Sequence, residues 1–131
     1  MVLPFGNVVV VRTMTGEAIA RLLDQQFDNP SPGRTALLQV SRGFSYAYDA
    51  SKPRERRIDR ASIRIGGEPL VPTRTYRVAS NDFVWNGGDN FVAAQEGTDP
   101  VAIGPDIDVF VRYLAKVSPV RSHEPDRIRA E

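Results

Sequence analysis

Apolar residues recur along the chain at two different spacings, and these spacings predict its strands and helices. The run "NVVVVRT" from Asn7 has no polar alternation, which is typical of a strand buried on both faces. The following segment places apolar residues at i, i+3, i+4 and i+8, which predicts one stripe of an amphipathic helix: Ile19, Leu22, Leu23 and Phe27.

The ends of this first helix also carry sequence signals. Thr15 can cap its start, and Glu17 lies in the first turn, where a negative charge favours the helix dipole. Pro30 and Pro32 end the helical pattern because proline cannot continue it. We therefore expect the chain to leave the helix before Pro30.

Two further strands are predicted at 35–41 ("TALLQVS") and 43–49 ("GFSYAYD"), joined around Arg42–Gly43. In the second, Phe44, Tyr46 and Tyr48 alternate with small residues and give it one aromatic face. We interpret this face as core packing.

The next stretch, "DASKPRERRIDR", could be a phosphate or nucleic-acid patch, but acidic residues interrupt it and no aromatics are interleaved. We therefore expect a solvated loop.

The second half repeats these signals. Gly66–Gly67 follows an alternating apolar stretch and suits a tight turn. "TYRVAS" (75–80) predicts a strand, and "GPDIDVFVRYLAKVS" predicts a second amphipathic helix with Asp106 as a cap and these apolar positions: Ile107, Phe110, Val111 and Leu114. The polar tail from Ser118 is expected to be extended or frayed.

These elements predict an α+β, or mixed α/β, fold in which mixed β-sheet layers are covered by at least two helices. No internal repeat divides the chain. We expect one domain over residues 1–117 and a polar C-terminal tail over residues 118–131.

Composition narrows the function classes. The 17 basic and 16 acidic residues give a net charge of +1, so no broad electrostatic attraction to nucleic acid or anionic membrane is expected. No apolar run is long enough for membrane insertion. Without cysteine, the chain lacks the residues for a disulfide or thiol catalysis. Because its only histidine, His123, lies in the polar tail, we expect neither a His-rich metal site nor a catalytic triad.

The segment "NDFVWNGGDNFV" (81–92) combines aromatic, acidic and glycine residues that could form a binding site. It follows a predicted strand, where rigid folds commonly present ligand-contacting loops. Gly87 and Gly88 permit a sharp turn, an aromatic ring can stack on a nucleobase, and the carboxylate of Asp89 can accept hydrogen bonds from sugar hydroxyls. Asn90 after Asp89 is compatible with a left-handed backbone.

Two other interpretations of this segment remain open. It is a surface turn if its aromatics pack into the core and Asp89 caps the amides of the turn itself. Alternatively, Asp82 and Asp89 form an acid–base pair in an autonomous small enzyme, although no neighbouring group is visible to tune either carboxyl pKa.

Two separated motifs, "LPFGN" (3–7) and "TYRVASNDFVWNGGDNF" (75–91), resemble the C-terminal domain of the 5'-nucleotidase family, which includes UDP-sugar hydrolases and cyclic-phosphodiesterase/nucleotidases. The intervening stretches occur in the same order, so the resemblance covers nearly the whole chain. It implies a base clamped between Phe5 and Phe83, ribose hydroxyls contacted by Asp89, and a close-approach turn at Gly87 and Gly88. Asn86 belongs to the same substrate-binding segment.

The chain also departs from the family pattern. Asn90 replaces the last glycine of GGDG, and Trp85 stands where a small residue is usual, which predicts an altered pocket rim. The family domain usually begins about 30 residues earlier, so we expect its first strand–helix unit to be lacking and the exposed edge to favour a homodimer.

The resemblance also implies partners and a location. Hydrolysis in the family belongs to a metallophosphatase domain with two divalent metal ions, so this chain alone is expected to be inactive and to bind a nucleotide or nucleoside. The alternative is a fragment of such an enzyme that does not bind and only self-associates. The resemblance suggests a periplasmic, cell-surface or secreted location.

Overall fold

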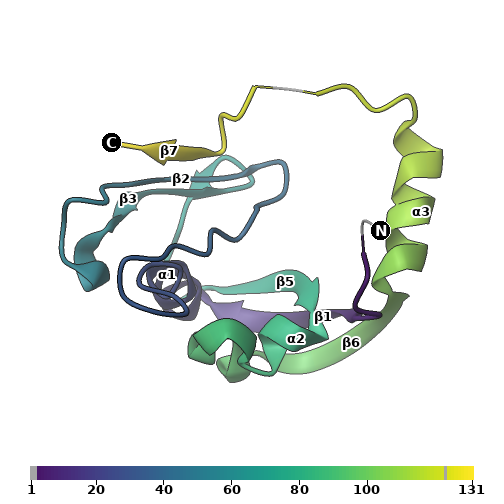
Figure 1. Cartoon of the computed structure of the whole chain (residues 1–131), viewed down its shortest axis with the longest axis horizontal. Helices are drawn as coiled ribbons and strands as arrows, with labels where there is room; N and C mark the ends of the chain where they lie inside the picture. The colour runs from purple at the N-terminus through teal and green to yellow at the C-terminus, as the bar shows by residue number, and fades with distance from the viewer. Residues whose placement is uncertain (1–2, 123) are drawn as a thin grey trace.

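The computed structural model describes residues 3–122 and 124–131 and shows two small β-sheets with a helix between them (Figure 1). The strands and α-helices run in the order β1 (Val8–Thr15), α1 (Gly16–Asp24), β2 (Phe44–Tyr48), β3 (Ile58–Ile65), β4 (Glu68–Pro69), β5 (Thr75–Asn81), α2 (Asp82–Trp85), β6 (Thr98–Pro105), α3 (Asp106–Val117) and β7 (Ile128–Ala130). Three short 3₁₀ turns lie at η1 (Arg54–Arg56), η2 (Gly88–Asn90) and η3 (Val92–Glu96). The architecture is α+β with mixed sheets, as the sequence predicts.

One sheet has three antiparallel strands in the order β5-β1-β6. The register places Val9 opposite Asn81 at one end of the β1–β5 pair and Thr15 opposite Thr75 at the other. The start of β1 therefore lies beside the end of β5. This pairing brings the two conspicuous sequence motifs, 3–7 and 81–92, to the same end of the sheet.

The other sheet has four strands in the order β4-β3-β2-β7, with β2 and β7 parallel and the remaining pairs antiparallel. The predicted Gly66–Gly67 turn joins β3 to β4, with φ angles of 62° and 82° that glycine adopts without steric cost. The aromatic face of β2 packs into the core as interpreted, since Tyr46 is fully buried and Phe44 and Tyr48 lie against the same cluster.

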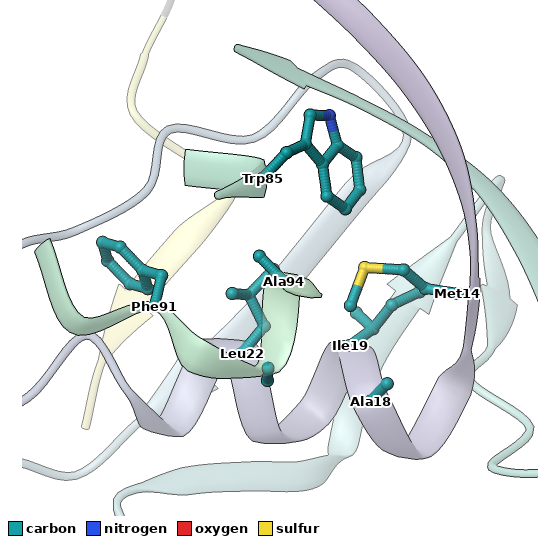
Figure 2. Close-up of a cluster of buried hydrophobic side chains, with 8 residues drawn as sticks. Met14, Ala18, Ile19, Leu22, Trp85, Phe91 and Ala94 are labelled. Carbon is teal, nitrogen blue, oxygen red and sulfur yellow. The ribbon is translucent and has the colours of Figure 1, made fainter. Parts of the chain in front are cut away.

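Helix α1 supplies side chains to both hydrophobic cores. Thr15 caps it as predicted, because its Oγ1 accepts a hydrogen bond from the Ala18 amide at 3.2 Å. Ile19 and Leu22 pack in the core next to the three-stranded sheet, while Leu23 packs in the core next to the four-stranded sheet. Figure 2 shows the first of these cores, with Met14, Trp85, Phe91 and Ala94 gathered over the helix.

The predicted strand at 35–41 does not form. Beyond an isolated bridge between Phe27 and Thr35, this segment runs as irregular chain beside the end of α1. The reason lies in Gln26, whose carbonyl accepts from the Ala36 amide at 2.8 Å and whose side-chain Oε1 accepts from the Leu38 amide at 2.6 Å. These bonds satisfy backbone donors that a strand would otherwise direct to a neighbour.

Strand β1 is half-buried, not buried on both faces as its valine run suggests. Val8–Val11 are all of intermediate exposure, because only one face of the three-stranded sheet packs against a core within the described chain. Its second neighbour, β6, went unpredicted. Its sequence does not look like a strand because it contains Pro100, Gly104 and Pro105, residues that are unfavourable inside a sheet. Its pairing with β1 also has two irregularities in register.

Helix α3 forms as predicted, but its apolar face remains largely uncovered. Ile107 and Val111 are 44 % and 55 % exposed, and no residue of the helix is buried. Asp106 lies inside the first turn and accepts from the Ile107 amide, so Pro105 occupies the cap position instead. No helix within residues 3–122 and 124–131 is long and apolar enough to cross a membrane.

The polar tail is partly ordered by the four-stranded sheet. Residues 128–130 form β7, and Ile128 lies opposite Tyr46 in a parallel pairing with β2. Of the two expectations for the tail, extended or frayed, this stretch is extended. Figure 1 shows the chain crossing from α3 back to β2 to make this contact.

Candidate functional site

The segment 81–92 forms a single helical turn followed by a left-handed loop. Asn81 caps α2, since its Oδ1 accepts from the Val84 amide at 2.9 Å. The chain then turns at Gly87, with φ of 82°, and Asp89 and Asn90 follow with φ of 52° and 61°. The left-handed conformation expected at Asn90 is confirmed, and Asp89 shares it. Consecutive non-glycine residues in this region cost backbone energy, so surrounding contacts must hold the loop.

A hydrogen bond ties this segment to the start of β1. Oδ1 of Asp82 accepts from the Val8 amide at 3.0 Å, across 74 positions of sequence. Phe5 precedes Val8 by three residues, which can span no more than about 11 Å of extended chain. Phe5 and Phe83 therefore belong to the same end of the three-stranded sheet, although they are far apart in sequence.

The aromatic residues of the two motifs divide into exposed and buried groups. Phe5 is 83 % exposed and Phe83 is 48 % exposed, so both rings are available to a ligand. Trp85 and Phe91 are buried in the core next to α1 (Figure 2), as expected for some of the aromatics. The indole of Trp85 points inward and donates to the Val10 carbonyl, and its effect on the pocket rim stays a prediction.

The two glycines of the turn each make room for a neighbouring side chain. A Cβ on Gly88 would lie 2.6 Å from Cζ of Phe83 and 2.6 Å from its carbonyl oxygen, so the Phe83 ring rests against Gly88. A Cβ on Gly87 would lie 3.0 Å from Cδ of Gln95. Protein side chains thus approach both glycines, and the close approach of the turn to a ligand stays a prediction.

The polar groups of the turn face solvent. Asn86 and Asp89 are exposed, and within residues 3–122 and 124–131 the Asp89 carboxylate has no hydrogen bond or ion pair. Asp89 therefore does not cap its own turn. Asp82 is engaged by the Val8 amide, which gives it a structural role and weakens the acid–base interpretation of Asp82 with Asp89.

Contacts from α1 and from the chain after the turn hold this loop, and sequence reasoning missed them. Arg21 makes a bidentate ion pair with Glu96, one hydrogen bond being 2.7 Å long. The pKa of Glu96 lies below its ordinary value because Arg21 donates hydrogen bonds to it. Oε1 of Gln25 accepts from the Ala93 amide at 2.9 Å, and Nε2 of Gln95 donates to the Asn86 carbonyl at 3.1 Å. No sequence signal marks these polar residues, because their partners lie on other elements.

Two arginines after residue 50 make contacts that hold the fold together. Arg57 pairs with Asp28 at 3.1 Å and stacks over Phe27, and Arg60 bonds to both Glu17 and Asp24 on α1. Residues 50–57 form the expected loop, whereas residues 58–60 already belong to β3. The arginines that could have formed a phosphate patch are thus partly committed to internal ion pairs.

Two hollows of the surface are lined mostly by residues outside the 81–92 segment. One of about 480 Å³ is lined by Arg42, Arg64 and Arg127 around the β2 and β3 ends. Another of about 430 Å³ lies between the sheets and reaches the 81–92 segment, with Leu22, Tyr76 and Trp85 in its wall. Within the described residues, no three His, Cys, Asp or Glu side chains gather as a metal site requires, and His123 lies outside these residues.

Comparison with known proteins gives consistent matches. Residues 1–96 match the family model described as 5'-nucleotidase, C-terminal domain. The chain is 35 % identical over 112 residues to the cell wall protein Lmo0130 of Listeria monocytogenes, covering 85 % of this chain and 14 % of that protein. It is 32 % identical over 120 residues to the trifunctional nucleotide phosphoesterase protein YfkN of Bacillus subtilis, covering 88 % of this chain and 8 % of that protein.

A solved structure matches the fold over almost all of the chain. The 5'-nucleotidase precursor from Thermus thermophilus superimposes with a TM-score of 0.83 at 34 % identity, over 98 % of this chain and 26 % of that one. The chain thus spans about a quarter of that protein's length, and less of the two relatives named above.

Proposed function

Because the chain belongs to the 5'-nucleotidase C-terminal domain family, we propose that it holds the nucleoside part of a nucleotide for a phosphoester hydrolase. In this proposal the base lies between the rings of Phe5 and Phe83. The carboxylate of Asp89 accepts hydrogen bonds from the ribose hydroxyls. The glycine turn at Gly87 and Gly88, with Asn86 before it, forms the rest of the surface against the ligand.

One observation carries this proposal. Two exposed phenylalanines, 78 positions apart in sequence, belong to the same end of one sheet, next to a left-handed turn that exposes a carboxylate without a protein partner. An exposed aromatic ring loses apolar contact with water when a base stacks on it, and such stacking contributes about 1–3 kcal/mol per base. An unpaired carboxylate beside it can bind two hydroxyl groups of a ribose.

The test is a titration of the 131-residue chain with adenosine, followed by amide NMR shifts. We expect shifts around residues 5–7 and 83–90, and an affinity about tenfold weaker in Phe83→Ala and in Phe5→Ala. Tyr113→Ala, which removes an exposed aromatic on α3, is the matched control and should bind as the wild type does. Equal binding by the wild type and both phenylalanine variants would contradict the clamp.

The role of Asp89 has its own test. Asp89→Asn should weaken the binding of adenosine more than that of 2',3'-dideoxyadenosine, which lacks the two hydroxyls. A carboxylate acceptor forms charge-assisted hydrogen bonds that the amide cannot replace at equal strength. Equal losses for both nucleosides would contradict a contact between Asp89 and the ribose.

Hydrolysis in this proposal belongs to a metallophosphatase domain that holds two divalent metal ions and receives the phosphate. The described residues of the chain do not provide such a ligand set, so no chemical step is assigned to them. The chain by itself should release no phosphate from AMP in the presence of Mn²⁺. A periplasmic, cell-surface or secreted location belongs to the same proposal and is supported by a relative described as a cell wall protein.

Self-association without ligand binding is the second candidate. It is favoured by the β6 edge of the three-stranded sheet, where Val101 and Ile103 are 51 % and 46 % exposed. An exposed strand edge with apolar side chains is a template for pairing with another chain. Sedimentation showing a concentration-dependent homodimer, together with no adenosine shifts, would favour this candidate. A monomer that binds adenosine would exclude it.

A further inference from the structure

We propose that Gln95 is the positioning residue that holds the Asn86–Gly88 turn and thereby sets the Phe83 ring and the Asp89 carboxylate for ligand binding. This inference rests on the proposed function. It goes beyond that function because it assigns a role to a side chain that does not touch the ligand.

The turn needs contacts from outside to hold its conformation. The turn and the two residues that follow it contain three left-handed φ angles, namely Gly87 at 82°, Asp89 at 52° and Asn90 at 61°. The two non-glycine residues carry a steric cost in this region. A chain segment with this cost opens readily unless contacts from outside the segment oppose the opening.

Gln95 makes two contacts with the turn. Its Nε2 donates to the Asn86 carbonyl at 3.1 Å. Its Cδ lies 3.0 Å from the position of a Cβ on Gly87, so the carboxamide covers the turn where a side chain would otherwise be. Gln95 is thus in contact with the residues on which the left-handed loop begins.

The position of the turn determines where the two proposed ligand contacts, the Phe83 ring and the Asp89 carboxylate, lie. The Phe83 ring rests against Gly88, as the 2.6 Å approach of its Cζ to a Cβ at that position indicates. Asp89 follows Gly88 directly. The chain after the loop is itself held to the end of α1, because Oε1 of Gln25, the residue that follows the helix, accepts from the Ala93 amide at 2.9 Å. Gln95 is therefore held by a fixed backbone two residues away.

The experiment uses the full chain and Gln95→Met, which keeps the side-chain length but removes the donor. We expect adenosine affinity about threefold weaker, faster backbone motion at residues 87–90 by ¹⁵N relaxation, and an unchanged unfolding midpoint. Gln39→Met, at an exposed glutamine outside this site, is the matched control and should change neither affinity nor motion.

A second variant keeps the test valid if Gln95→Met also lowers the unfolding midpoint. Gln95→Glu has a carboxylate that cannot donate at about pH 7 but can donate once protonated. Its turn should be more mobile than wild type at about pH 7 and should regain order near about pH 3.5. Glu96, Asp82 and Asp89 are carboxylates in the same region, so wild type at both pH values is the reference.

The outcomes separate this inference from the proposed function. Unchanged motion in Gln95→Met, or increased motion with wild-type affinity, would overturn the role of Gln95. If wild type binds no adenosine while Gln95→Met and Gln95→Glu loosen the turn, the proposed function fails and Gln95 still positions the turn.

Discussion

The indole Nε1 of Trp85 donates a hydrogen bond of 2.8 Å to the carbonyl oxygen of Val10, 75 positions earlier in the sequence. At this point the pairing of β1 with β6 is irregular, since Val9 lies opposite Gly104 and Val10 lies opposite Ala102. The guanidinium of Arg12 lies over the same indole at 5.3 Å. Trp85 thus fixes α2, the element that precedes the glycine turn, to the central strand of its sheet.

Replacing Trp85 with phenylalanine should destabilise the protein. The variant Trp85→Phe leaves the Val10 carbonyl without this donor and removes buried volume, so we expect a loss of about 2–3 kcal/mol in the free energy of unfolding. Urea unfolding measures it, and the exposed Tyr113→Phe should change stability by no more than about 0.5 kcal/mol. Equal stability of Trp85→Phe and wild type would show that the indole bond contributes nothing.

A methyl group at Gly88 should displace the Phe83 ring. The added Cβ would approach Cζ and the carbonyl oxygen of Phe83 to 2.6 Å each, so we expect Gly88→Ala to cost about 1–3 kcal/mol and to weaken adenosine binding. Urea unfolding and the adenosine titration measure both effects. In the double variant with Phe83→Ala the ring clash is absent and only the approach to the carbonyl oxygen of residue 83 remains, so the methyl group should cost less there than in the wild type. Strict additivity would mean that Gly88 and the ring are independent.

Position 90 should tolerate glycine and reject a β-branched residue. Asn90 has φ of 61°, a conformation that glycine adopts freely and that costs other residues about 1–2 kcal/mol. Asn90→Gly, which restores the GGDG motif typical of the family, should change unfolding free energy by less than about 0.5 kcal/mol. Asn90→Val should cost about 1–2 kcal/mol. A stable Asn90→Val would indicate that the loop rearranges in solution.

The ion pair between Arg21 and Glu96 should stabilise the protein only above acidic pH. The pKa of Glu96 is lowered in the folded protein because Arg21 donates to the carboxylate, so this contribution is present above the unfolded pKa and is lost as pH falls through the folded pKa. Since both side chains are nearly half exposed, Glu96→Gln should cost about 0.5 kcal/mol or less at neutral pH.

The control for this pair is the same comparison at about pH 3. There the stabilities of wild type and Glu96→Gln should lie closer together, because the contribution of the anionic pair is lost as pH falls through the lowered pKa of Glu96. Urea unfolding at both pH values gives the two differences. A difference that is larger at acidic than at neutral pH would contradict the sign of this prediction.

Much of the fold could be predicted because local signals agreed with the final packing. Thr15 caps α1 and the apolar stripe from Ile19 to Phe27 is buried, as periodicity alone implies. The Gly66–Gly67 turn follows from the backbone freedom of glycine. The strand predicted at 35–41 failed because the Gln26 side chain competes for its backbone, and β6 was missed because proline and glycine obscure its period.

The sequence by itself determined which functional groups the candidate site contains. It placed two aromatic motifs, a glycine turn and a carboxylate in one chain of balanced charge without cysteine, and it identified the family through motifs about 80 positions apart. Tertiary structure decided which of these groups are available. Antiparallel pairing of β1 with β5 joined the two motifs at one end of a sheet, packing turned Trp85 inward and left Phe83 exposed, and Gln95 came to lie against Gly87. The physical reason is that local periodicity encodes only which face of an element is apolar, whereas strand register and side-chain hydrogen bonds between distant residues exist only once the elements have packed.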